Sequence, residues 1–306
     1  MLGRLALLVV LTLSFLYVAG KLMACRRETE PQALEPQGPG TRFLVTRSGR
    51  VHVLDVGKGD VLLLLHGSGR SVADWQQGFA ERLAERFRVV AFDNYGFGHS
   101  DRNHPFRYGN ALWERQAIDV MDAMGLDRVV VMGHSAGGVV AASLAADHPE
   151  RIRGAVFVGH GIAMDPEQIL PFMPGVGEVM MGRLEVFGST SSEQHRAQLI
   201  PAYRIRGTRE ALLTFIRRQY TIDGLRLLWG TYEDIRVPVL QVHGGRDASI
   251  PVAAARRLTD RLPAARFVEV PESGHDVHLD APEQLARAIS AFVADLAPRE
   301  RPATIE

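Results

Sequence analysis

The 306-residue sequence has little of several features that define protein classes, and each lack excludes a class. Its formal net charge is zero, which argues against a nucleic-acid-binding protein, because such proteins depend on a basic surface. The single cysteine, Cys25, excludes a disulfide scaffold and a cysteine-based zinc or iron–sulfur site. With 46% hydrophobic residues, and no period among its 30 Gly and 16 Pro, the chain is neither disordered nor collagen-like. The length exceeds that of one average domain, so we expect either one large domain with an insertion or two domains.

A hydrophobic segment at the N-terminus differs from the rest of the chain. Residues 5–20 carry no charge, and apolar residues occur all round the segment, so a soluble domain would have to bury it on every side. A helix over residues 5–24 is long enough to cross a membrane if the ammonium group of Lys21 extends to the membrane surface. We therefore predict membrane association through residues 5–24, with an uncleaved single-span anchor as the favoured form.

Two alternatives to the anchor stay open, and so does the side of the membrane. Residues 18–20 are small enough for the cleavage point of a secretory signal, and residues 22–25 resemble a lipobox in which Cys25 would carry the lipid. The basic residues after the segment favour a cytoplasmic catalytic domain, whereas a signal or a lipobox places that domain on the opposite side. After the anchor or signal segment, residues 1–25, we expect a Pro- and Gly-rich linker over residues 26–40.

From residue 41 onward, short apolar runs alternate with segments of helical spacing. Strands separated by helices predict an α/β fold with a mostly parallel sheet and helices on both faces. Between residues 161 and 234 the spacing is only helical, which predicts a helical lid inserted between core segments 41–160 and 235–306. The predicted strands are 42–46, 51–56, 61–65, 88–92, 128–132, 154–159, 237–242 and 266–270, and the predicted core helices are 74–87, 110–124, 136–147, 252–262 and 282–296.

The central motif is Gly-His-Ser-Ala-Gly over residues 133–137, between a valine-rich predicted strand and a predicted helix of small residues. This pattern in this context predicts a nucleophile elbow, a sharp turn that exposes the hydroxyl of Ser135. The flanking Gly133 and Gly137 keep Cβ atoms out of the turn. The helix that follows directs backbone N–H groups toward charge that develops beside the serine, so the N–H of Ala136 is a predicted oxyanion donor.

A serine hydroxyl needs a base, and the base needs an acid that holds its tautomer. His275 follows the last predicted strand and is favoured over His278, which lies in the lead-in to the final helix. Asp247 lies in a Gly-rich turn after the strand predicted over 237–242, at the sheet edge where open α/β sheets bind ligands. We predict a catalytic triad of Ser135, Asp247 and His275.

Further site residues are predicted in the loop after the third strand and in the lid. The second oxyanion donor is the backbone N–H of Ser68, and His66 is expected to brace the same loop. Flexible methionine side chains adapt to irregular apolar ligands, although packing of the lid itself explains these residues equally well. The candidate substrate contacts are His134, Met173, Met180 and Phe187.

Taken together, these motifs resemble the α/β-hydrolase superfamily, in its lidded serine esterase and lipase branch. The resemblance rests on residues 66–67, 93–100, 133–138 and 274–275 and on Asp247, and it extends from residue 41 to residue 296. It implies an eight-stranded sheet and a lid over residues 161–234. Serine at position 135 argues against the dehalogenase and epoxide-hydrolase branches, which have Asp there. The oxyanion loop also lacks the Gly-Gly-Gly run of the hormone-sensitive-lipase branch.

The first hypothesis is an enzyme that cleaves an apolar carboxylic ester, either a small molecule or a membrane lipid, through an acyl-enzyme on Ser135. A carbon–carbon bond hydrolase of the ring-cleavage type ranks lower, because those relatives often have Asn where this chain has His134. A cofactor-free perhydrolase on the same triad is a third hypothesis, and a membrane-tethered binding protein is a fourth. We predict no cofactor and no metal site, because the His-x-x-His of residues 275–278 shares its first histidine with the triad.

Overall fold

The computed structural model describes residues 2–32, 35–162, 170–188, 192–219, 221 and 231–296, with side chains from residue 5 onward. Eight strands form one sheet in the order β1-β2-β4-β3-β5-β6-β7-β8. β2 pairs antiparallel with β1 and β4, and every other neighbouring pair is parallel. The predicted mostly parallel, eight-stranded sheet is confirmed. Its strands are β1 (Thr41–Thr46), β2 (Gly49–Gly57), β3 (Val61–Leu65), β4 (Arg88–Phe92), β5 (Val129–His134), β6 (Ile152–Val158), β7 (Val239–Gly244) and β8 (Ala265–Val270).

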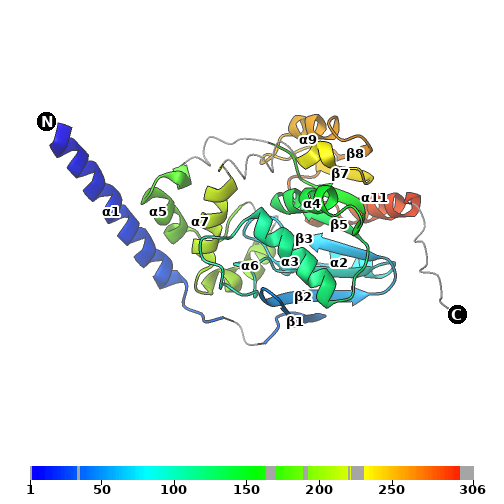
Figure 1. Cartoon of the computed structure of the whole chain (residues 1–306), viewed down its shortest axis with the longest axis horizontal. Helices are drawn as coiled ribbons and strands as arrows, with labels where there is room; N and C mark the ends of the chain where they lie inside the picture. The colour runs from blue at the N-terminus through cyan, green and yellow to red at the C-terminus, as the bar shows by residue number, and fades with distance from the viewer. Residues whose placement is uncertain are drawn as a thin grey trace.

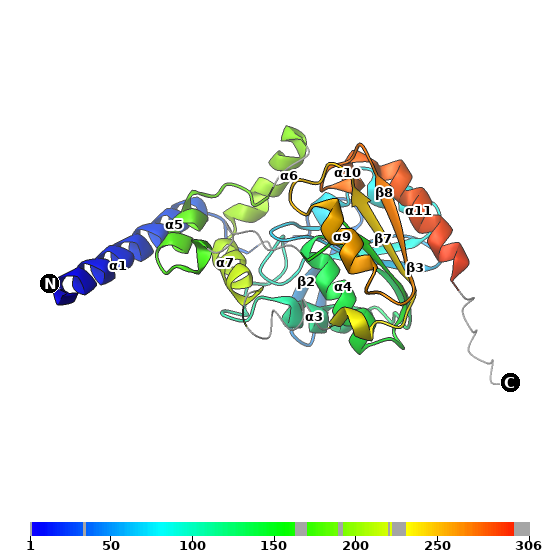
Figure 2. The same ribbon diagram turned by 90° about the horizontal axis from the view of Figure 1, so that it is seen from above.

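Helices cover both faces of the sheet, as Figure 2 shows for α9 and α11 on opposite sides of β7 and β8. Successive side chains of a strand point to opposite faces. In β3, Leu63 and Leu65 accordingly join the core under α3, α4 and α9, whereas Leu62 and Leu64 join the core under α2 and α11. All residues of β3 are buried, as expected of a central parallel strand. The core helices are α2 (Phe79–Ala84), α3 (Asn110–Ala123), α4 (Ala136–Asp147), α9 (Val252–Thr259), α10 (Val277–Asp280) and α11 (Pro282–Asp295).

The prediction of one continuous helix over residues 74–87 is wrong. A short 3-10 turn, η1 (Val72–Asp74), comes first, and the hydroxyl of Ser71 accepts a hydrogen bond from Ala73 at its start. Gly78 then has φ 89°, a left-handed conformation that interrupts a right-handed helix. α2 begins only after this glycine. The spacing of apolar residues was helical across the break, because Trp75 and Phe79 are both buried on the same side.

The described lid residues form α5 (Val176–Arg183), α6 (Glu193–Arg204), α7 (Thr208–Gln219) and the 3-10 turn η3 (Thr231–Asp234). They contain no strand beyond one isolated parallel bridge between Ile205 and Glu30. Glu30 lies in the predicted linker, and the carboxylate of nearby Glu28 accepts backbone hydrogen bonds from Gly207 and Arg209 at 2.8 and 2.7 Å. The first residues of that linker are therefore attached to the lid.

The long N-terminal helix α1 (Leu2–Arg27) extends away from the sheet and lies beside α5 (Figure 1). An 18-residue window within residues 5–27 has a mean hydropathy of 2.1, and this helix is long and apolar enough to cross a membrane, a property that signal sequences share. Many large apolar side chains of α1, such as Leu7 and Phe15, are exposed. Lys21 pairs with Glu210 of α7 at 3.0 Å, beside a cavity of about 200 Å³ between α1, α5 and α7.

The contact between α1 and α5 depends on glycines. A Cβ atom on Gly20 would lie 2.3 Å from the carbonyl carbon of Glu178, and one on Gly182 would lie 2.8 Å from the carbonyl oxygen of Gly20. Both distances are far inside van der Waals contact, so the two backbones can approach this closely only because Cβ atoms are absent.

We expect Gly20→Val to separate α1 from α5, because its side chain has no space against the backbone of α5. Hydrogen exchange of α5 amides in detergent should then be faster than in the wild type. Ser14→Val, at an exposed position of the same helix, is the matched control and should leave α5 unchanged. Equal exchange in the two variants would show that the helix contact does not protect α5.

Candidate active site

Ser135 lies in a strained turn between β5 and α4. Its φ of 51° is one of two positive values among the described non-glycine residues. A Cβ atom on Gly133 would lie 2.2 Å from the carbonyl oxygen of Gly137, and one on Gly137 would lie 2.3 Å from that of Leu65. The glycines at these two positions therefore allow the strand, the turn and the helix to pack at the separation that the structure has. This is the geometry that the nucleophile-elbow motif describes.

The backbone of the turn is held from both sides. The N–H of Ser135 donates to the carbonyl oxygen of Val158 at 2.9 Å, and its own carbonyl oxygen accepts from the Nδ1 of His160 at 2.8 Å. The Nε2 of His160 then accepts from the hydroxyl of Tyr232 at 2.7 Å. Burial lowers the pKa of His160 to about 4, so the ring is neutral near neutral pH. Sequence reasoning missed His160, because nothing in a single histidine at a strand end indicates its partners.

We expect the neutral state of His160 to make stability depend on pH. Its pKa is about 4 in the folded chain and near 6.5 when unfolded. The unfolded state therefore takes up the proton first, and stability falls as the pH drops from 6.5 towards 4, by up to about 1.4 kcal/mol per pH unit. His160→Gln should give a shallower slope in denaturant titrations over this range. His148→Gln, at a histidine whose side chain is only partly buried, is the control; an unchanged slope in His160→Gln would contradict the expectation.

Asp247 and His275 form a short pair, although 28 residues separate them in the sequence. The Nδ1 of His275 lies 2.8 Å from the Oδ2 of Asp247. The other carboxylate oxygen accepts backbone hydrogen bonds from Ser249 and Ile250, each at 2.8 Å. His243 adds its Nε2 at 3.2 Å from Oδ2. The carboxylate is thus held in one orientation, with its lone pairs directed at His275.

The surroundings of Asp247 stabilise the negative charge of its carboxylate. Burial alone would raise the pKa of Asp247, but the hydrogen bonds from His243 and His275 outweigh burial and hold that pKa well below its usual value. Asp247 is therefore ionised across the range in which histidine titrates, as an acid that orients a histidine must be. His243 is a second residue that sequence reasoning missed, although it stands in the same Gly-rich turn.

The loop after β3, in which an oxyanion donor is predicted, lies close to Ser135. A Cβ atom on Gly67 would lie 3.3 Å from the Cβ of Ser135. His66 braces the loop as predicted: its Nε2 accepts from the backbone N–H of Asn94 at 2.9 Å, and its Nδ1 donates to the carbonyl oxygen of Gly67 at 2.8 Å. Ser68 follows directly, and Ala136 begins α4 on the other side of Ser135. Their roles as oxyanion donors stay a prediction.

A tyrosine of the lid hydrogen-bonds to this loop. The hydroxyl of Tyr203, on α6, donates to the carbonyl oxygen of Gly69 at 2.9 Å and accepts from the backbone N–H of Phe187 at 3.2 Å. A Cβ atom on Gly69 would lie 3.1 Å from the Cβ of Phe187. Of the predicted substrate contacts, Phe187 therefore lies beside the oxyanion loop.

The remaining predicted substrate contacts lie elsewhere. Met173 precedes α5 and Met180 belongs to it, and their exposed fractions are 47% and 37%. His134 is 1% exposed, and its Nε2 lies 3.2 Å from the carbonyl oxygen of His275, so its side chain supports the segment that carries His275. Contact of these residues with substrate stays a prediction.

Beneath the lid, a buried charged network joins segments that are distant in the sequence. Arg70, directly after the oxyanion loop, pairs with Asp276 at 3.2 Å and lies 3.1 Å from the Nε2 of His195 on α6. The same nitrogen of His195 lies 2.9 Å from Asp74. Sequence reasoning missed this network, because each member is an isolated charged residue in its own segment.

The fold and the site define a hydrolase of the α/β class. Residues 60–282 match the family model of the α/β hydrolase fold, and the chain belongs to this family. It is 31% identical over 268 residues to a 2-hydroxymuconate semialdehyde hydrolase of Pseudomonas putida, which covers 83% of this chain and 94% of that relative. It is 31% identical over 251 residues to a putative carbamate hydrolase, RutD, of Caulobacter vibrioides, which covers 76% of this chain and 90% of the relative.

Solved structures extend the likeness at the level of the fold. A meta-cleavage product hydrolase of Pseudomonas fluorescens matches with a TM-score of 0.68 at 22% identity, over 83% of this chain and 97% of that chain. A membrane phospholipase A, described as a bacterial virulence factor, matches with a TM-score of 0.65 at 23% identity, over 96% of this chain and 97% of that chain. The unmatched 4% of this chain is shorter than α1, which has 26 residues. This second likeness therefore includes part of the N-terminal helix.

Proposed function

We propose that the protein is a serine hydrolase in which Ser135 attacks a carbonyl group, His275 is the base and Asp247 orients His275. The observation that carries this proposal is the 2.8 Å pair between Asp247 and the Nδ1 of His275, together with the strained turn at Ser135. Because Nδ1 donates to the carboxylate, Nε2 is left to take the proton of the serine hydroxyl. The backbone N–H groups of Ser68 and Ala136 are the proposed oxyanion donors.

We infer further that the bond cleaved is a carbon–carbon bond next to a ketone, in a conjugated keto acid. The relatives support this hypothesis better than ester cleavage, which ranked first on sequence alone. They include hydrolases named for 2-hydroxymuconate semialdehyde and, at 30% identity over 270 residues, for 2-hydroxy-6-oxo-2,4-heptadienoate. The sequence argument against this hypothesis was that His134 stands where such relatives often have Asn. The side chain of His134 is buried and contacts the backbone of His275, so this residue supports the proposed base.

The proposed reaction balances with water alone. Ser135 adds to the ketone carbonyl and passes its proton to His275. When the carbon–carbon bond breaks, its electron pair goes to the leaving carbon, where a conjugated carbonyl stabilises it, and that carbon takes the proton from His275. Water, deprotonated by His275, then hydrolyses the acyl-enzyme to a carboxylic acid and frees Ser135.

The test compares two substrate classes on one preparation. The full chain, purified in detergent, is assayed with 2-hydroxy-6-oxo-2,4-heptadienoate and with p-nitrophenyl esters of increasing chain length, and fluorophosphonate labelling of a separate aliquot counts the reactive serines. We expect labelling of Ser135 and a higher kcat/KM for the keto acid. Labelling with turnover of esters only would reject the carbon–carbon assignment, and failure to label Ser135 would reject the serine mechanism.

Ester cleavage on a membrane lipid is the second candidate, because α1 lies against the lid and carries exposed apolar side chains. The fold likeness to a membrane phospholipase A, which includes part of α1, supports it. We propose membrane association through residues 5–24 on the same ground. Membrane fractionation of the full chain, followed by an assay on phospholipid vesicles, tests both parts. A soluble full-length protein would remove the anchor.

A further inference from the structure

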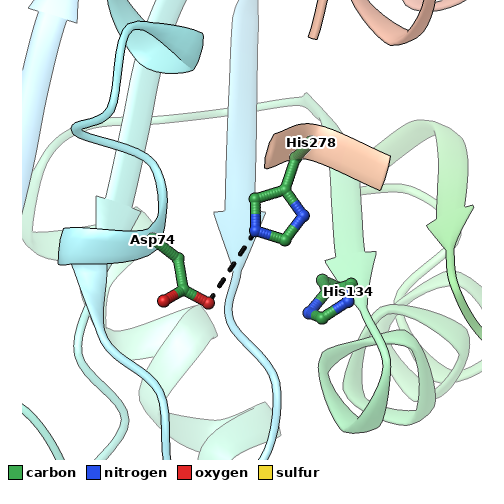
Figure 3. Close-up of side chains that lie close together, drawn as sticks. All are labelled: Asp74, His134 and His278. Carbon is green, nitrogen blue, oxygen red and sulfur yellow. Dashed lines mark ion pairs between the residues drawn. The ribbon is translucent and has the colours of Figure 1, made fainter. Parts of the chain in front are cut away.

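Three buried side chains face one another, as Figure 3 shows, and one of them directly precedes Ser135 in the chain. They are Asp74 of η1, His134 at the end of β5 and His278 of α10. Each offers one ligand atom, and these atoms all lie within 4.8 Å of one another. The Oδ2 of Asp74 and the Nε2 of His278 are 3.8 Å apart, and no residue of the three is more than 1% exposed.

Four buried polar atoms of these three side chains have no hydrogen-bond partner among the described residues. They are the Oδ2 of Asp74, the Nδ1 of His134 and both ring nitrogens of His278. Buried polar atoms in folded proteins are nearly always paired, so four in one place require an explanation. The remaining polar atoms of Asp74 and His134 are held: the Oδ1 of Asp74 by His195 at 2.9 Å, and the Nε2 of His134 beside the carbonyl oxygen of His275.

The chemistry of these atoms suits a divalent transition metal. Burial lowers the pKa of His278 to about 3 and that of His134 well below its usual value, so both rings are neutral and keep a lone pair. Two neutral imidazoles and one carboxylate form a common donor set for such metals. The contact of His195 with Asp74 is of the kind that holds a metal-binding carboxylate in place.

The surrounding charges also favour a cation. Asp74 and Asp276 are two buried carboxylates, and Arg70 is the guanidinium beside both. Arg70 approaches the Oδ1 of Asp74, at 3.9 Å, and leaves Oδ2 directed at the histidines. The two carboxylates and the one guanidinium leave a net negative charge, which attracts a cation to the space between Oδ2 and the two imidazoles.

We propose that Asp74, His134 and His278 bind one divalent transition-metal ion, with Zn²⁺ as the probe. The site would be structural, because its ligands are buried and belong to three different segments. Asp74 follows the oxyanion loop, His134 precedes Ser135, and His278 follows His275 by three residues. The ion would therefore join the three segments that carry the parts of the proposed catalytic site.

The sequence did not indicate this site, because the ligands are 60 and 144 residues apart. The nearest metal-like motif, residues 275–278, is divided by the fold: His275 pairs with Asp247, whereas His278 turns towards Asp74. No step of the proposed reaction passes through the ion, so its failure and the failure of the proposed function are independent.

The test measures metal content and stability, and needs no substrate. The full chain is purified in detergent without a histidine tag, equilibrated with Zn²⁺, gel-filtered and analysed by inductively coupled plasma mass spectrometry. We expect equimolar zinc in the wild type and in the control His148→Gln, and at least about tenfold less in His278→Asn. A strong chelator should lower the Tm of the wild type and of the control.

Several outcomes would overturn the proposal. Wild-type protein without tightly held zinc, and with a Tm unchanged by zinc or chelator, would mean that water fills the site. Equal zinc in His278→Asn and the wild type would place the ion elsewhere. If His278→Asn does not fold, Co²⁺-loaded wild type decides, because a site with these three ligands gives visible absorption bands that excess Zn²⁺ removes; their absence rejects the site.

Discussion

Replacing Ser135 with alanine is expected to lower kcat by at least ~10⁴-fold on whichever substrate the wild type turns over. The hydroxyl is the atom that forms the acyl-enzyme, and the positive φ of this residue shows that the chain maintains strain at this position. The side chain of alanine is smaller, so the turn itself should persist. Initial rates with equal amounts of folded enzyme, checked by thermal unfolding, measure the effect.

The matched control is Ser143→Ala in α4. Ser143 is also buried, but its hydroxyl has no partner among the described residues, so the same substitution removes no hydrogen bond seen there. We expect wild-type rates from this control. If Ser135→Ala kept more than a tenth of the wild-type kcat, the serine mechanism would be wrong for both proposed bond types.

Asp247→Asn is expected to lower kcat by ~10³- to 10⁴-fold, with little change in the amount of folded protein. The carboxylate accepts from His275 and from two backbone N–H groups. An amide keeps one oxygen for the backbone and turns its NH₂ group to the histidine. His275 then has to present the lone pair of Nδ1 to that donor, which places the proton on Nε2 and removes the base.

Asp260→Asn is the control for this substitution, because Asp260 is exposed at the end of α9. It should behave as the wild type in activity and in unfolding. A loss of only a few-fold in Asp247→Asn would instead assign the orienting role to another group, and His243, which lies 3.2 Å from the same carboxylate, would be examined next.

Local patterns in the sequence predicted the sheet, most core helices and the residues of the proposed triad. β3 is apolar throughout because both its faces are buried, and Gly133 is needed because a Cβ atom there would meet the backbone of Gly137, four residues away. Such features can be recognised in the sequence of a single segment. The extent of α2 was missed because a single glycine, Gly78, interrupts an otherwise helical spacing.

Contacts between distant segments could not be recognised in this way. His160, His243 and the network around Arg70 acquire partners only when several loops meet at one edge of the sheet. Each of these residues has a burial and a charge environment that depend on the whole fold. The predicted domain boundaries and the substrate contacts Met173 and Met180 likewise depend on the lid, and they stay predictions.

The hydroxyl of Tyr203 has a thermodynamic consequence. It bonds both to the carbonyl oxygen of Gly69 in the oxyanion loop and to the backbone of Phe187 in the lid. Any displacement of the lid that separates Tyr203 from Gly69 leaves that carbonyl oxygen to find another donor. By reciprocity, a ligand that holds the oxyanion loop in place also favours the position of the lid in which Tyr203 bonds to Gly69. Binding of a ligand and the position of the lid are therefore linked through the hydroxyl of Tyr203.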